Sequence, residues 1–105
     1  FFSPGFASSL EEIPMNVAGV AGNTITLTCK GSEDVTVLIW ERSTIENPSQ
    51  FSAVAGTRIK TDFDSATHVS TLKITNLATS DAGTYSCKPG DGSEDVGYAQ
   101  VVVLG

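Results

Sequence analysis

The clearest pattern along this chain is an alternation of hydrophobic and polar residues with a period of two. In residues 24–29, threonines occupy one face and apolar residues with a cysteine occupy the other, which predicts a half-buried antiparallel strand. No segment of useful length has a helical period. Similar patterns predict strands at residues 36–42, 57–62, 68–74, 84–89 and 98–104, and a short edge strand at 50–55. The predicted class is all-β, with short strands at sandwich-like spacing.

The same alternation divides the side chains of each strand between two faces. Trp40 is expected to point into the core, which places Thr36 and Leu38 on its face of the strand. Val37 and Ile39 then point the other way, followed by Glu41. The further residues expected to face inward are Ile25, Leu27, Cys29, Ser70, Leu72, Ile74, Tyr85, Cys87, Ala99, Val101 and Val103.

Length and charge narrow the range of functions. A chain of 105 residues with 40% hydrophobic residues is long enough for one core and too short for two ordinary domains. We expect one domain at residues 10–105, with residues 1–9 as an N-terminal segment or linker. The formal net charge of -6 disfavours nucleic acid and anionic membranes as partners. No apolar run approaches the roughly 20 residues that span a bilayer, so we expect no direct membrane insertion.

The sequence shows no apparatus for catalysis. It has one histidine and two cysteines, with no glycine-rich phosphate loop and no paired metal-ligand motif. The histidine, His68, stands next to a strand start, where a solvated side chain is the expectation. We therefore expect no enzyme activity, no cofactor and no metal site.

Three features of the sequence coincide in order. Cys29 lies on one predicted strand, Trp40 on the next, and the run Asp81-Ala82-Gly83-Thr84-Tyr85-Ser86-Cys87 comes late in the chain. This arrangement resembles the immunoglobulin superfamily, whose domains carry Cys, then Trp, then Asp-x-Gly-x-Tyr-x-Cys. The resemblance covers nearly the whole chain, from about residue 10 to residue 104. It implies an immunoglobulin-like two-sheet antiparallel Greek-key sandwich.

The resemblance also implies roles for individual residues. Cys29 and Cys87 would form a disulfide across the core, with the alternative of two buried thiols in a cytosolic domain. Tyr85 would bond back to nearby backbone, and Arg58 would pair with Asp81, an exposed edge arginine being the alternative. The residues assigned to the structural core are Trp40, Tyr85, Asp81, Arg58 and Leu72.

The subtype of the domain follows from two further features. Residues 40–58 have room for a short C′ strand but hardly for a C″ strand, and Pro14 is placed where it would divide the first strand. Both indicate an intermediate (I-set) or shortened variable type. The last strand lacks the Phe/Trp-Gly-x-Gly of antibody and T-cell receptor variable domains, which disfavours a rearranging antigen receptor.

One sheet face is a candidate partner surface. The resemblance makes the predicted strands at residues 98–104, 84–89 and 36–42 strands G, F and C, with a short C′ strand within residues 40–58. Together they direct an unusual number of apolar side chains outward, where water should wet the sheet. Variable-type relatives pair through this face; ordinary outward valines are the alternative. The candidate partner-binding residues are Val37, Ile39, Lys88, Tyr98, Gln100 and Val102.

The five-residue segment GSEDV occurs twice, at residues 31–35 and 92–96. In the immunoglobulin frame these become the neighbouring BC and FG loops, so we expect one acidic pole rather than a structural repeat. Its centre is Glu33, Asp34, Asp91, Glu94 and Asp95, and Glu11, Glu12, Asp62 and Asp64 are expected at the same end. Solvated charge, a basic protein partner and a Ca²⁺ site are the three interpretations.

We therefore expect an extracellular recognition or adhesion module, at the cell surface or secreted. It would bind a protein, homophilically or heterophilically, through the GFCC′ face or the BC/FG loop end. The alternatives are a structural spacer in a tandem array and a soluble defence-type binder. The fold hosts many roles, so the fold by itself does not choose among them.

Overall fold

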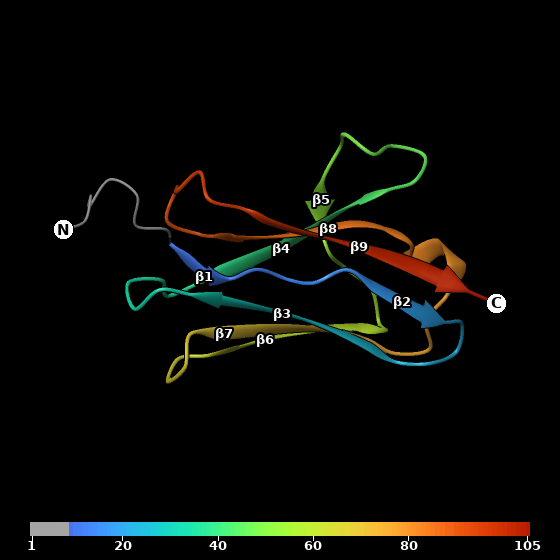
Figure 1. Ribbon diagram of the computed structural model, residues 1–105, viewed down its shortest axis with the longest axis horizontal. Coiled ribbons are helices and arrows are strands. Elements are labelled where there is room, and N and C mark those ends of the chain that lie inside the picture. Colours follow the sequence, from blue (N-terminus) through green and yellow to red (C-terminus); the bar gives the residue numbers. More distant parts are fainter. Residues whose placement is uncertain (1–8) are drawn as a thin grey trace.

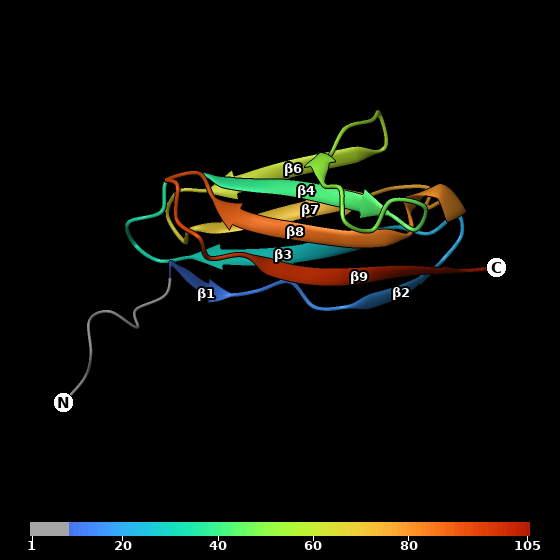
Figure 2. The same ribbon diagram turned by 90° about the horizontal axis from the view of Figure 1, so that it is seen from above.

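The computed structural model describes residues 9–105, which form two packed β-sheets (Figures 1 and 2). One sheet has the strand order β1-β3-β7-β6 and the other β2-β9-β8-β4-β5. A 3-10 turn, Thr79–Asp81, precedes β8. The strands are β1 Leu10–Glu12, β2 Val17–Val20, β3 Ile25–Gly31, β4 Leu38–Thr44, β5 Ser52–Ala53, β6 Ile59–Asp64, β7 Val69–Ile74, β8 Gly83–Pro89 and β9 Gly97–Leu104.

The all-β sandwich predicted from the sequence is confirmed, with one pair of strands that is not antiparallel. β1 pairs antiparallel with β3, whereas β2 pairs parallel with β9 in the other sheet. The chain changes sheets at the buried Pro14, which has no N–H to donate to a ladder. Asn16 follows, and its side-chain oxygen accepts from the Gln100 amide at 2.8 Å. A proline-divided first strand was expected, but its parallel half was not.

A second difference concerns the start of β4. Thr36, expected to face inward, is exposed, and the strand begins only at Leu38. Val35, within the first GSEDV, is buried instead, at 2% exposed. A turn from Ser32 to Val35 folds the valine under Gly31, where a Cβ on the glycine would contact Val35 directly. The local turn therefore overrides the strand alternation.

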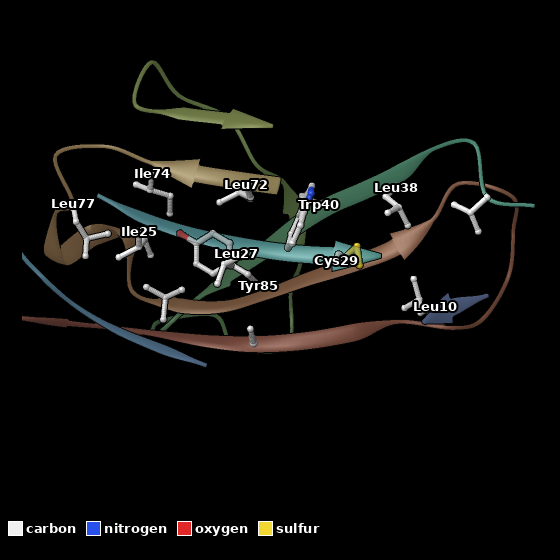
Figure 3. Close-up of a cluster of buried hydrophobic side chains, with 14 residues drawn as sticks. Leu10, Ile25, Leu27, Cys29, Leu38, Trp40, Leu72, Ile74, Leu77 and Tyr85 are labelled. Carbon is white, nitrogen blue, oxygen red and sulfur yellow. A yellow bond between two sulfur atoms is a disulfide. The ribbon is translucent and has the colours of Figure 1, made fainter. Parts of the chain in front are cut away.

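The core lies between the sheets and is centred on a disulfide. Cys29 and Cys87 are joined and fully buried, as expected. Trp40 lies opposite Cys87 in the β4–β8 ladder, and Figure 3 shows it between the two sheets. Its indole N–H donates to Ser70 Oγ at 2.9 Å, and Ser70 in turn donates to the Asp62 carbonyl. The buried Trp40 indole and the Ser70 hydroxyl thus each have a partner, as burial requires.

A polar corner closes one end of the sandwich around Tyr85 and Asp81. The Tyr85 hydroxyl donates to the Asp81 carbonyl at 2.7 Å. Arg58 donates two hydrogen bonds to the Asp81 carboxylate, at 2.7 and 3.1 Å. Arg42, for which the sequence predicts no role, donates to the Tyr85 hydroxyl at 3.0 Å and lies over its ring. These contacts lock the turn before β8 onto β4 and the start of β6.

The pKa of Asp81 follows from this corner. Burial by itself would raise the pKa of the carboxyl group. Hydrogen bonds from Arg58 and the Ala78 amide, with the positive charges of Arg58 and Arg42, outweigh burial and hold the pKa below its ordinary value. Burial raises the pKa of Tyr85, so its hydroxyl remains protonated and able to donate at neutral pH.

Candidate binding face

The five-stranded sheet turns one face inward and leaves the other open. Its register places Ile39 beside Lys88 and Ser86 beside Tyr98. Because successive side chains of a strand alternate, Val37, Gln100 and Val102 share this outer face. The structure therefore brings the six candidate partner-binding residues onto one surface.

The apolar members of this face are well exposed. The exposed fraction runs from 39% for Ile39 to 53% for Tyr98, with Val37 and Val102 between them. Two further exposed apolar residues, Val20 and Leu104, are register partners at the β2–β9 edge. Val20 joins this face because β2 extends the sheet alongside β9, a pairing that the sequence pattern does not indicate.

The loop between β4 and β5 contributes an aromatic side chain to the same face. Phe51 is half-buried, and its ring lies 5.8 Å from that of Tyr98, tilted by 57°. Nearby, Lys88 Nζ lies 3.1 Å from a Glu41 carboxylate oxygen. Ser86 points to the outer face and yet is only 3% exposed, since its larger neighbours cover it. The edge strand expected at residues 50–55 is shorter in the structure, because β5 covers only Ser52–Ala53, so Phe51 lies in the loop before it.

The two GSEDV segments lie at one end of the molecule, together with the β6–β7 turn (Figures 1 and 2). Glu33, Asp34, Asp91 and Glu94 are exposed there. Asp95 differs, because it is half-buried and accepts from the Ser9 amide at 2.6 Å. Within residues 9–105, no three His, Cys, Asp or Glu side chains come together in a group that could hold a metal ion.

The expectation of a solvated His68 is wrong. The side chain is half-buried, and its Nδ1 lies 2.9 Å from the Val35 carbonyl oxygen. Its ring meets Phe63 edge-on, with the ring centroids 6.2 Å apart. His68 ties the turn before β7 to the first GSEDV loop, so its position is structural. The backbone there has a positive φ of 61°, which the strand pattern did not reveal.

Comparison with known proteins places this arrangement in a family. A family model described as "Immunoglobulin domain" matches residues 9–89, and the chain belongs to that family. Domains of this family are typically non-catalytic binding or structural modules. In the described part of the chain, no helix is long and apolar enough to cross a membrane.

A solved structure with a similar fold is a chimeric titin Z1Z2-Z1Z2 tandem functionalised with a GRGDS peptide from fibronectin. The TM-score is 0.72 at 22% sequence identity, and the match covers 91% of this chain and 49% of the tandem. The chain thus spans about half the length of that tandem protein. At this identity the likeness establishes the fold.

Proposed function

We propose that this domain is a protein-recognition module that binds its partner through the outer face of the β2-β9-β8-β4-β5 sheet. The observation that carries the proposal is the row of exposed apolar side chains on that face, including Ile39, Tyr98 and Val102. These residues lie on paired strands rather than on loops, so the surface is formed before a partner arrives. Preformed apolar patches of this kind mark interaction sites.

The proposed setting is extracellular, at the cell surface or in a secreted protein. The disulfide between Cys29 and Cys87 supports this setting, because such bonds persist in oxidising compartments and are rare in the cytosol. The partner is a protein, either a second copy of the domain or a different chain. The acidic pole at the end of the sandwich would steer a basic partner toward this face.

The test changes the face without disturbing the core. Ile39→Lys and Tyr98→Lys place charge among the exposed apolar side chains, and Thr26→Lys is the matched control on the exposed side of β3 in the other sheet. Sedimentation velocity over a range of concentrations measures self-association. Binding of a fluorescent tetramer of the domain to intact cells measures recognition of a different protein.

We expect the wild type and Thr26→Lys to behave alike in at least one of these assays, with saturable association. Both face variants should lose that association by about tenfold or more, since a charge buried at an interface without a partner costs several kcal/mol. Equal association by all four proteins would refute the face as the binding surface. No association in either assay would favour the spacer alternative.

A further inference from the structure

A surface pocket of about 300 Å³ lies on the proposed binding face, next to the second GSEDV loop. Its floor is Ser86 on β8, flanked in register by Glu41 on β4 and Tyr98 on β9. Phe51 and Glu94 contribute walls from the β4–β5 and β8–β9 loops. Pockets for drug-sized ligands begin at about this volume, so the space suits a single side chain.

Ser86 offers a ligand an unpaired hydrogen-bonding group at the floor of the pocket. It is 97% removed from solvent by its neighbours, being 3% exposed. Ser86 lines the pocket, and its hydroxyl has no hydrogen-bond partner among residues 9–105, although the oxygen atom keeps some contact with solvent. A hydroxyl group on the floor of a pocket, where only water meets it, can take up a hydrogen bond with a ligand without leaving another protein group unpaired. A donor that enters the pocket would supply the missing hydrogen bond.

The walls indicate which donor fits. The rings of Phe51 and Tyr98 meet at 57°, and the more exposed ring, Tyr98, offers a face to a planar cation. Three carboxylates line the pocket, Glu41, Glu94 and Asp95, against one cation, Lys88. In the described part of the chain, Glu94 takes part in no ion pair. The pocket therefore combines an aromatic surface with an excess of negative charge.

We propose that this pocket receives the guanidinium group of an arginine side chain from the protein partner; the inference rests on the proposed function of the face. Arginine matches the three features together, because its plane stacks on an aromatic ring and its five N–H donors reach carboxylates and a hydroxyl at once. The ligand would donate to Glu94 and Ser86 while stacking against Tyr98.

Lys88 competes with the ligand for Glu41. Its ammonium already holds that carboxylate at 3.1 Å, so an incoming arginine gains from Glu41 only by sharing or displacing the lysine. Removing the lysine charge should therefore strengthen binding. The expected gain is about twofold to fivefold, because the exposed ion pair that is lost is a weak one.

The probe is N-acetyl-arginine N-methylamide, titrated into the ¹⁵N-labelled domain and followed by amide chemical shifts. The neutral isostere N-acetyl-citrulline N-methylamide is the matched control ligand. We expect saturable shifts at Ser86 and Tyr98 with arginine, at millimolar affinity, and none that saturate with citrulline. Glu94→Gln should weaken binding at least fivefold and Lys88→Gln should strengthen it. Glu46→Gln, an exposed glutamate in the β4–β5 loop outside the pocket, should change the affinity less than twofold.

Three results would overturn the inference. The first is an absence of saturable shifts with arginine, or equal shifts with citrulline. The second is an equal effect of Glu94→Gln and Glu46→Gln, which would mean that arginine senses only the overall charge. The third is a capped lysine that binds as tightly as arginine, which would remove the guanidinium from the assignment.

These outcomes can be distinguished from those that test the proposed function. If arginine binds the pocket while Ile39→Lys leaves partner association unchanged, the face is refuted as the binding surface and the assignment of the pocket stands. If Ile39→Lys abolishes partner association but arginine does not bind, the face stands as the binding surface and the assignment of the pocket to arginine is refuted. The small probe and the face variants thus test different statements.

Discussion

Reduction of the disulfide should remove a large part of the stability of this domain. Cys29 and Cys87 are 58 residues apart in the sequence. In the chain-entropy model, a cross-link over a loop of that length lowers the entropy of the unfolded chain by about 14 cal/mol/K, or about 4 kcal/mol at room temperature. Domains of this size unfold with about 5–15 kcal/mol in total. The reduced domain should therefore be close to the limit of folding.

Urea unfolding followed by tryptophan fluorescence measures this difference. Trp40 is the only tryptophan and lies opposite Cys87 in the ladder, so its emission reports on the packing around the bridge. Both cysteines are fully buried, so the bond is reduced in denaturant and the protein refolded in reductant. With a slope of about 2 kcal/mol/M, the loss of about 4 kcal/mol lowers the midpoint by about 2 M.

The control is the double variant Cys29→Ala with Cys87→Ala, which has no bridge and should unfold at the same midpoint with and without reductant. A difference below about 1 kcal/mol between oxidised and reduced wild type would contradict the reasoning. It would mean that the sandwich is stable without its bridge. The disulfide would then no longer support the proposal of an oxidising, extracellular setting.

Three further predictions concern the corner and the acidic pole. Asp81→Asn should cost about 1.5–3 kcal/mol by urea unfolding, the range for hydrogen bonds to a charged group, against less than about 0.5 kcal/mol for the exposed Asp34→Asn. Because the pKa of Asp81 is lowered, the difference in free energy of unfolding between wild type and Asp81→Asn should be constant above about pH 5 and should shrink as the pH falls below about 4. A difference that does not depend on pH would refute the ion pair. Gly83→Ala should lower the stability of the domain more than Gly56→Ala. Both glycines have positive φ, but only at Gly83 would the new Cβ overlap a carbonyl oxygen, that of Ser43. Equal melting temperatures of the two variants would contradict this. Glu33→Gln with Asp34→Asn should slow association with a basic partner in stopped-flow measurements at low salt, and an unchanged on-rate would reduce the pole to solvated charge.

Much of the fold was predictable because local pattern and global packing agree. The alternation in β3 and β7 places Leu27 and Leu72 inward, and the structure buries both. The resemblance to the immunoglobulin superfamily implied the Cys29–Cys87 bridge, a buried Trp40 and a pairing of Arg58 with Asp81, and the structure contains all three. These contacts join residues far apart in the sequence, so they came from the family resemblance, whereas the alternation of β3 and β7 is a local signal.

The features that were not predictable depend on tertiary placement. Val35 looked like the end of a polar loop, but the turn at Ser32 folds it inward. Phe51 falls within the edge strand expected at residues 50–55, but β5 covers only Ser52–Ala53, and the loop before it places the Phe51 ring against Tyr98. Ser86 follows the outward alternation of β8 correctly, yet its burial depends on side chains from other strands. The pocket is built from such residues, so the sequence did not indicate it.

The placement of the surfaces bears on the choice between a recognition module and a spacer. β1 begins at the acidic pole and β9 ends at the opposite end of the sandwich (Figure 1), so neighbours in a tandem array would occupy the two ends. The apolar face lies along the side of the molecule, where such neighbours would not cover it. A spacer gains nothing from exposed side chains such as Tyr98 and Val102 on that side, and it risks aggregation through them. A recognition module needs them there, because a lateral face remains free to bind whatever the chain attaches at its ends.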